Sequence, residues 1–294
     1  MEMIRNINFL FCFCFVLLIA CNSKQTNNST NTEDSTEASE LYKKGINALN
    51  QEKDYEQALT LLIKASEMGN TEAMIDLGQM YYEGIGVAQD YSKAFEWYMK
   101  AAEQGYARAQ YNLGYCYRFG QGIDQNPHKA IEWYIKAAEQ GCAQAQFDLG
   151  YCYEKGFGVE QNSHKAFEWY MKAAEQGYAL AQCILGFCYQ EGIGIEQNPH
   201  KAFEWYMKAV EQGYALAQHD LGFCYDSGIG VEQNPHKAFE WYMKAAEQGH
   251  AASQYIVGLC YQIGHGVEQN PNKAYEWFVK AAEQGYEKAI KALE

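Results

Sequence analysis

The sequence Ala-Phe-Glu-Trp-Tyr-Met-Lys-Ala-Ala-Glu-Gln-Gly at residues 94–105 recurs, with small changes, along most of the chain. Its tryptophan marks the repeat, because successive tryptophans are always 36 residues apart. A fixed period of about 20–50 residues indicates stacked units, none of which can bury its apolar face alone. The chain has 6 tryptophans, and all of them belong to this series: Trp97, Trp133, Trp169, Trp205, Trp241 and Trp277.

Residues 107–141 show how one unit is predicted to fold. Its first half has apolar residues at the spacing of one face of a helix, namely Ala109, Leu113, Cys116 and Tyr117. Gly114 lies in the same stripe, where the missing side chain lets a second helix approach closely. The unit therefore predicts a first helix that packs tightly against a partner helix.

The second half of this unit predicts that partner helix. Glycines at residues 120–122 break the first helix. Asn126 is a strong N-cap and Pro127 suits the first helical position, so a new helix starts there. Gly141 ends it. The residues that it presents to the first helix are Ala130, Tyr134, Ala137 and Ala138.

The repeat divides the folded part of the chain into units. Residues 39–70 form an atypical first unit without the tryptophan or the glycine loop, and residues 286–294 begin a further helix that caps the far end. We therefore predict an all-α fold of stacked helix pairs. Six regular units lie between these ends, at residues 71–105, 107–141, 143–177, 179–213, 215–249 and 251–285.

Over residues 71–285 the repeat resembles the Sel-one-like repeat (SLR), a relative of the tetratricopeptide repeat. The resemblance lies in the patterns Ala-x-Ala-Gln-x-x-Leu-Gly-x-x-Tyr, Gly-x-Gly-Val and Lys-Ala-x-Glu-Trp-Tyr-x-Lys-Ala-Ala-Glu-Gln-Gly. Residues 39–70 are nearer a plain tetratricopeptide hairpin. The resemblance implies a right-handed α-solenoid of about seven antiparallel helix pairs, six of them of SLR type. It also implies a binding scaffold or adaptor, so we expect no enzymatic activity and no cofactor.

The N-terminus differs from the repeats. Residues 9–20 are an apolar run, too short to span a bilayer and suited to the central region of a signal peptide. The run ends in Leu-Ile-Ala-Cys, which resembles the lipobox of bacterial lipoproteins and implies that residues 1–20 are removed and Cys21 is lipidated. A conventional cleaved signal and an uncleaved anchor are the alternatives. Residues 21–38 would then form a polar, disordered tether.

The lipoprotein resemblance implies a place in the bacterial cell envelope. Asn22 follows the lipidated cysteine in place of an acidic residue, which favours the outer membrane, with the body facing the periplasm or the cell surface. We expect contact with the membrane only through the lipid.

Composition and spacing argue against several other functions. The net charge of −14 disfavours nucleic acid, because phosphate binding needs clustered Lys and Arg. The Gly-x-Gly loops lack the third glycine of a dinucleotide site. His128, His164, His200 and His236 recur one unit apart, too far to share a metal ion, and no other group predicts one.

Cysteine also follows the repeat. Five cysteines share one position of the first helix, and we predict that the seven cysteines beyond the N-terminal segment are buried, reduced thiols. Cysteine-rich relatives of the Helicobacter type carry a bridged cysteine pair eight residues apart. Here the corresponding pairs are Ala102/Gln110, Ala138/Gln146 and Ala174/Gln182, so that bridge is not expected.

Positions at which the repeats differ should face solvent or a ligand, and three rows on the first helices stand out. The first row is Tyr111, Phe147, Cys183, His219 and Tyr255; the second row is Tyr115, Tyr151, Phe187, Phe223 and Leu259. A rim row, Arg118, Glu154, Gln190, Asp226 and Gln262, has mixed polarity. In the tetratricopeptide class the face with the first two rows lines the concave groove.

We therefore predict that a protein or peptide binds in an aromatic-lined groove. Its predicted contact residues are Tyr111, Tyr115, Phe147, Tyr151, Phe187, His219, Phe223 and Tyr255. The alternative is that these rings only fill the interior. An envelope hydrolase acting on β-lactam or cell-wall substrates and a binder of cell-wall glycan are the alternative functions.

Overall fold

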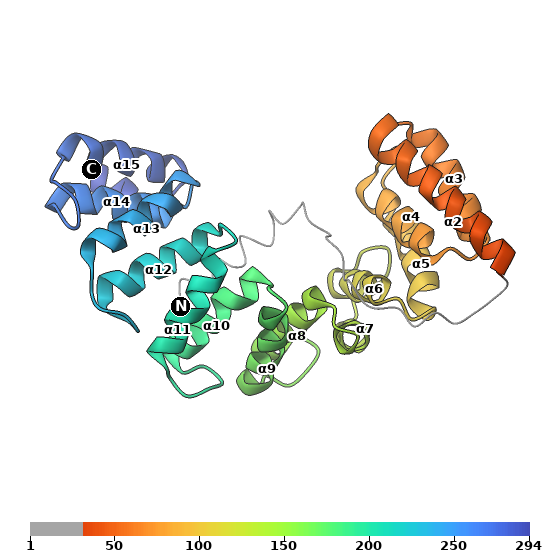
Figure 1. Ribbon diagram of the computed structural model, residues 1–294, viewed down its shortest axis with the longest axis horizontal. Helices are drawn as coiled ribbons and strands as arrows, with labels where there is room; N and C mark the ends of the chain where they lie inside the picture. Colours follow the sequence, from red (N-terminus) through yellow and green to blue (C-terminus); the bar gives the residue numbers. More distant parts are fainter. Residues whose placement is uncertain (1–31) are drawn as a thin grey trace. The chain divides into compact units, whose positions relative to one another are not determined.

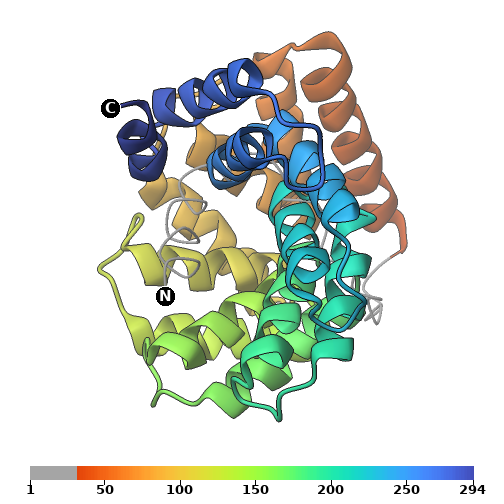
Figure 2. The same ribbon diagram turned by 90° about the vertical axis from the view of Figure 1, so that its left-hand side faces the viewer.

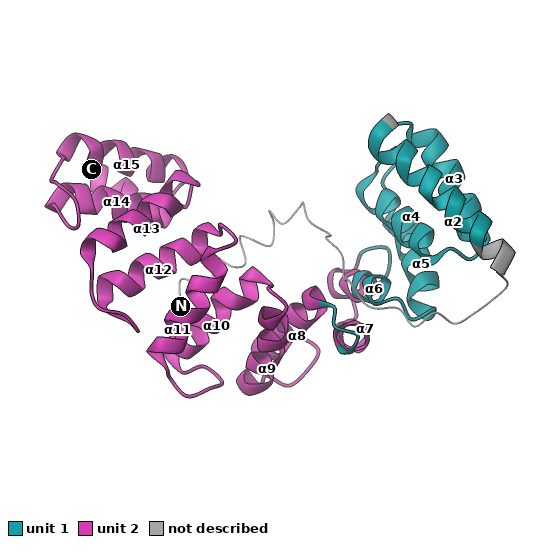
Figure 3. Cartoon of the chain, viewed as in Figure 1, with its two compact units in different colours: residues 1–113, 121–123, 139–142 teal, residues 114–120, 124–138, 143–294 magenta. Residues whose placement is uncertain are grey.

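The computed structural model describes residues 32–294. The predicted signal peptide, the lipidation site Cys21 and residues 22–31 of the predicted tether lie outside this range. All regular elements of the described part are helices, which confirms the predicted all-α solenoid class. The chain divides into two compact units, coloured separately in Figure 3, and each is described by itself.

Unit 1 contains residues up to 113 together with residues 121–123 and 139–142, so helices α6 and α7 contribute to both units. The helices that belong wholly to unit 1 pack pairwise, α2 on α3 and α4 on α5. Unit 1 contains α2 (Thr32–Asn47), a π-helical turn (Ala48–Glu52), α3 (Tyr55–Glu67), α4 (Thr71–Glu83) and α5 (Tyr91–Glu103). The shared helices are α6 (Ala107–Phe119) and α7 (Pro127–Glu139).

Unit 2 contains most of the regular repeats, and each of its helices packs on its neighbours along the chain (Figures 1 and 2). Its first helices are α8 (Ala143–Lys155), α10 (Ala179–Glu191), α12 (Ala215–Ser227) and α14 (Ala251–Ile263). Its second helices are α9 (Ser163–Glu175), α11 (Pro199–Val210), α13 (Pro235–Glu247) and α15 (Pro271–Glu283). The last element is the short α16 (Glu287–Leu293).

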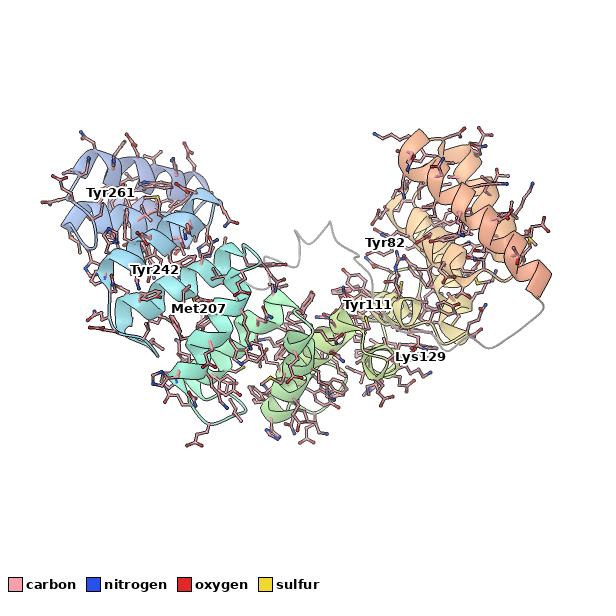
Figure 4. The ribbon with its side chains drawn as sticks, in the orientation of Figure 1. Tyr82, Tyr111, Lys129, Met207, Tyr242 and Tyr261 are labelled. Atoms are coloured by element: carbon pink, nitrogen blue, oxygen red, sulfur yellow. The ribbon has the colours of Figure 1, made fainter. Side chains whose placement is uncertain are left out.

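Within each of the six regular pairs, the two helices meet at a glycine and an aromatic ring. A Cβ atom added to Gly222 would lie 2.8 Å from the ring of Tyr242, which is labelled in Figure 4. Tyr242 is 2% exposed, so this ring is core, whereas the neighbouring Trp241 is only half-buried and lies under the ammonium group of Lys244. The same close approach recurs at Gly78, Gly114, Gly150, Gly186 and Gly258.

The loop within each pair is fixed by the same few contacts in every regular repeat. In the third, Asn162 caps α9, because its Oδ1 accepts the backbone N–H of Lys165 at 2.9 Å. Gly158 has φ of +68°, and a Cβ atom there would lie 2.5 Å from the carbonyl oxygen of Pro127 in the preceding pair. The predicted caps and helix starts are confirmed, and these loops also pack one repeat on the next.

Buried glutamines link consecutive repeats. Gln146 is 5% exposed, and its amide nitrogen donates to the carbonyl of Ala138 at the end of the preceding pair. Its oxygen accepts from Gln176, which ends the helix α9 of its own pair, at 2.7 Å. These bonds use polar groups that a helix end leaves unpaired. Gln182, Gln218 and Gln254 make the corresponding glutamine contacts.

The predicted tether, residues 21–38, extends seven residues into the first helix of the structure. Helix α2 begins at Thr32, although residues 32–38 were predicted to be disordered. Ala38 is 3% exposed and α2 packs against α3, so this helix is already part of the packed core at Ala38. In the part of the chain that the structure describes, no helix has the length and apolar composition needed to cross a membrane.

Candidate binding face of the first helices

The first row fills the space between consecutive repeats. Phe147 is 3% exposed, and its ring centroid lies 5.5 Å from that of Tyr170 and 5.1 Å from that of Tyr178. Tyr170 belongs to the second helix of the same pair, and Tyr178 immediately precedes the next pair. The prediction that Phe147 contacts a partner is therefore wrong, because its ring is enclosed by its neighbours.

The other residues of the first row are buried or half-buried, and Tyr255 makes the same ring contacts as Phe147. Tyr255 is half-buried between Phe278 and Tyr286, with ring centroids 5.6 and 5.5 Å away. Cys183 is 1% exposed. Tyr111, labelled in Figure 4, is half-buried in α6. The first row thus has more of a packing role than the groove prediction gave it, and partner contact by Tyr111 and Tyr255 stays a prediction.

At His219 the first row forms a polar cluster that the sequence analysis missed. The Nδ1 atoms of His219 and His250 each lie 2.8 Å from the hydroxyl oxygen of Ser253. The backbone N–H of Ser253 also donates to His250 Nδ1, which therefore acts as an acceptor. It follows that the hydroxyl donates to His250 and accepts from His219. Burial lowers the pKa of His219 to about 3 and that of His250 to about 4.

This cluster combines a hydroxyl with two imidazoles that do not recur in the other repeats, so we considered it as a site for a hydrolase. Ser253 is 0% exposed, however, and the Nδ1 atoms of both histidines contact its hydroxyl. A nucleophile must reach the atom that it attacks, so a serine enclosed in this way is suited to structure rather than to acyl transfer. In this repeat the hydrogen bonds are added to the ring contacts of the first row, because the His219 ring centroid still lies 5.5 Å from that of Tyr242 and 4.8 Å from that of His250.

The second row is more accessible than the first. Phe223 is 41% exposed, and Phe187 on the preceding first helix is half-buried. The ring of Tyr115 is half-buried and lies 4.4 Å from that of Phe119. Tyr151 is covered on one side by a cation from the preceding repeat. These residues come from successive first helices, so a ring recurs along one face of the repeats.

The cation over Tyr151 is Arg118, which is held by a carboxylate. Arg118 Nη1 lies 2.8 Å from Asp148 Oδ1, and both side chains are nearly fully buried. The guanidinium carbon lies 4.8 Å from the ring centroid of Tyr151 and 5.7 Å from that of Phe157. A planar guanidinium is well suited to bind a carboxylate and stack on rings together. The two residues thus form a buried ion pair between consecutive repeats.

Asp220 occupies the position of Asp148 two repeats further along, but without such a cation. It is 5% exposed, and none of the described residues offers its Oδ2 a hydrogen bond. Burial raises the pKa of Asp220 to about 8, whereas Asp148 has the Arg118 guanidinium beside it. Neither aspartate was predicted to be a site residue, because no role was assigned to that position of the repeat.

One residue of the rim row, Asp226, connects its repeat to the loop of the next. Asp226 Oδ1 lies 2.6 Å from Nε2 of His265, 39 residues later. In unit 1 the Tyr82 hydroxyl donates to Gln121 Oε1 at 2.8 Å over the same separation. Asp226 and Tyr82, which occupies the same position of the repeat, therefore hold neighbouring repeats together.

The thiol prediction is confirmed for six of its seven cysteines. Cys116, Cys152, Cys183, Cys188, Cys224 and Cys260 are buried and free. Burial raises the pKa of Cys116 and of Cys152 to about 12, which keeps these thiols protonated and unreactive. Cys142 is also buried, but it is disulfide-bonded, so the prediction of a free thiol is wrong there.

The repeated histidines lie at the surface, and two of them contact the next repeat. Nδ1 of His164 lies 3.0 Å from the carbonyl oxygen of Gly194, and His200 makes the same contact with Gly230. No group of three or more potential metal ligands occurs within residues 32–294. His164 and His200 are therefore assigned to packing between repeats.

The comparisons with known proteins agree with this architecture. The sequence model of the Sel1 repeat family matches residues 37–70, 71–106, 107–142, 143–178, 179–214, 215–250 and 251–286, and the chain belongs to this family. The match includes residues 37–70, which the sequence analysis separated as a tetratricopeptide-like unit. Sel1 repeat proteins generally act as scaffolds for protein–protein interaction. No curated protein matched the sequence.

Two similar solved structures share the fold. A protective antigen of uropathogenic Escherichia coli that displays an SLR fold is 38% identical, with a TM-score of 0.78 over 86% of this chain and 55% of that one. This chain thus spans about half the length of the antigen. A Sel1 repeat protein from Oxalobacter formigenes is 36% identical, with a TM-score of 0.72 over 85% of this chain and 97% of that one.

The His219–Ser253–His250 cluster predicts a loss of stability in acid. Both histidines have lower pKa values folded than unfolded, so the unfolded state binds more protons below about pH 6.5. Their contribution is complete above that pH and is lost as the pH falls towards 4 and 3. At pH 5.5 we expect a loss of about 1 kcal/mol for each histidine, measured by urea unfolding.

The control is a double variant, His219→Tyr/His250→Tyr, which places at both positions the residue that Tyr255 and Tyr286 provide one repeat later. It should lose less stability than the wild type between pH 7.5 and 5.5. The exposed His128→Gln variant should behave as the wild type does. Equal acid sensitivity of the double variant and the wild type would contradict this account of the cluster.

Proposed function

We propose that this Sel1 repeat protein is a non-enzymatic scaffold of the bacterial envelope that binds a protein or peptide through the second row of its first helices. The observation that supports this most is Phe223, a ring that is 41% exposed in a row with an aromatic residue on four successive first helices. Exposed rings on a rigid framework suit partner binding, because little order has to be gained on association.

The second row replaces the broader groove of the sequence prediction. Tyr115, Tyr151, Phe187 and Phe223 are the proposed contacts, and Phe147 is left out because it is buried. Leu259 extends the row by one apolar residue. We assign no nucleic acid partner, since the net charge of −14 opposes phosphate binding.

The proposed envelope location rests on residues 1–21, which lie outside the described range. The apolar run and the lipobox-like Leu-Ile-Ala-Cys sequence support cleavage before Cys21 and attachment of a lipid to its thiol. The similar chain of uropathogenic Escherichia coli is a protective antigen, which favours a location that antibodies reach. The outer membrane is favoured by Asn22.

The two alternative functions, a hydrolase and a glycan binder, have less support than the protein-binding scaffold. A hydrolase would have to use the Ser253 hydroxyl, which is enclosed by His219 and His250. A glycan binder could use the rings of the second row, because sugars also stack on aromatic rings. We favour a protein partner, since scaffolding of proteins is the general role of the Sel1 repeat family.

A double variant tests the second row as the binding surface. Phe187→Ala/Phe223→Ala should reduce partner recovery from envelope extract at least tenfold, because aromatic anchors at interfaces contribute about 1–2 kcal/mol or more each. Its helical circular dichroism should match that of the wild type. Partner recovery is quantified by mass spectrometry of proteins retained on the immobilised chain.

The matched control is Tyr275→Ala, which removes a ring that is 63% exposed on the second helix α15. This variant should retain the same partners as the wild type. If Phe187→Ala/Phe223→Ala recovers the same partners at the same level, the second row is not the binding surface. Retention of cell-wall fragments rather than proteins would favour the glycan alternative.

Lipidation is tested on the chain produced in a bacterial host. The mature N-terminal peptide should begin at Cys21 and carry the mass of a diacylglycerol on the thiol, and Cys21→Ala should abolish membrane fractionation. An unmodified N-terminus cleaved at another residue would contradict the lipid anchor. The binding surface would then remain to be tested independently, since it does not depend on residues 1–31.

A further inference from the structure

Asp148 and Asp220 occupy the same place in two repeats of unit 2 but have different surroundings. Asp148 is the sixth residue of α8 and Asp220 the sixth residue of α12. Each is followed three residues later by a ring of the second row, Tyr151 or Phe223. The repeat therefore places a carboxyl and a ring together on both helices.

The two repeats differ in the residue that faces this pair from the preceding first helix. At Asp148 it is Arg118, the twelfth residue of α6, and at Asp220 the equivalent residue is Gln190 of α10. The amide nitrogen of Gln190 donates to Glu191 Oε1 at 3.0 Å, and its oxygen accepts from the Tyr206 hydroxyl. Gln190 thus does not supply the cation that Arg118 supplies.

Without that cation, Asp220 and Phe223 differ from Asp148 and Tyr151 in two ways. Asp220 Oδ2 is buried without a hydrogen bond among the described residues, a costly state for a polar group. The Phe223 ring is 41% exposed, whereas Tyr151 is half-buried under the Arg118 guanidinium. The Asp220 carboxyl thus has an oxygen without a hydrogen bond, and the Phe223 ring is partly open to solvent. At the equivalent place, the Arg118 guanidinium bonds to Asp148 and also stacks on Tyr151.

We infer that Asp220 and Phe223 form a subsite for the arginine side chain of a bound protein segment, which takes the place that Arg118 takes over Asp148 and Tyr151. The subsite deepens the proposed function and depends on it, because the arginine would belong to the partner held on the second row. Entry of the guanidinium displaces the Gln190 side chain, which is held by an exposed contact and one long bond of 3.3 Å.

The occupant belongs to a different protein rather than to a second copy of this chain. The described residues contain two arginines, Arg108 and Arg118, and both are already bonded to aspartates, Asp76 and Asp148. A cationic partner also complements the net charge of −14. Arginine fits better than lysine, because a planar guanidinium can bond to the carboxyl while it stacks on Phe223.

The test is selection of 12-residue random peptides displayed on phage against the full chain. Peptides selected by the wild type should be enriched in arginine at one aligned position, beside apolar residues. A selected peptide and its versions with citrulline or lysine at that position are then measured by fluorescence anisotropy. Both replacements should weaken binding to the wild type at least tenfold.

Two variants of the subsite and one control complete the test. Asp220→Asn should remove the preference, so that the arginine and citrulline peptides bind within about twofold of each other. Gln190→Arg should place an internal guanidinium on Asp220, which blocks the arginine peptide and raises the stability of the chain to urea. Glu204→Gln, a loss of one exposed charge on α11, should leave binding unchanged.

The outcomes separate this inference from the proposed function. Peptides that bind through the second row without an arginine preference, or with an equal preference for lysine, would overturn the subsite and leave the scaffold standing. An arginine preference that survives in both Asp220→Asn and Gln190→Arg would also overturn it. Failure to select any peptide would contradict peptide binding itself.

Discussion

Contact between a glycine and an aromatic ring inside each of the six regular helix pairs is the constraint on which the rest of the structure depends. At Gly150 a Cβ atom would lie 2.7 Å from the ring of Tyr170, and that ring is 1% exposed and cannot move aside. Because the first helix has no side chain there, the second helix can approach until the tyrosine is enclosed. The alanines of the second helix, such as Ala173 and Ala174, complete the same interface.

This constraint explains why the repeats hardly vary at their packing positions and vary on one face. Once the pair interface is fixed, the next pair is held by the Gln146-type bonds and by the close approach of Gly158 to Pro127. The hydrogen bond from Gln146 to Ala138 thus connects one repeat to the next.

Much of the fold could be predicted from the sequence, because it depends on interactions within about 36 residues. The N-cap at Asn162 and the close approach at Gly114 follow from local rules of helix capping and packing. Burial of Phe147 could not be predicted, since the same periodicity describes a groove residue and a filler. The Arg118–Asp148 pair and the His219–Ser253–His250 cluster were missed, because each joins residues of different repeats that break the pattern.

In the proposed function, the packing positions hold the framework and the second row of the first helices recognises the partner. Hydrogen exchange of the chain with and without a selected peptide tests this claim most directly. We expect slower exchange on binding in α10 and α12, which carry Phe187 and Phe223, and little change in α11 and α13. Slower exchange confined to the second helices, with α10 and α12 unchanged, would contradict it.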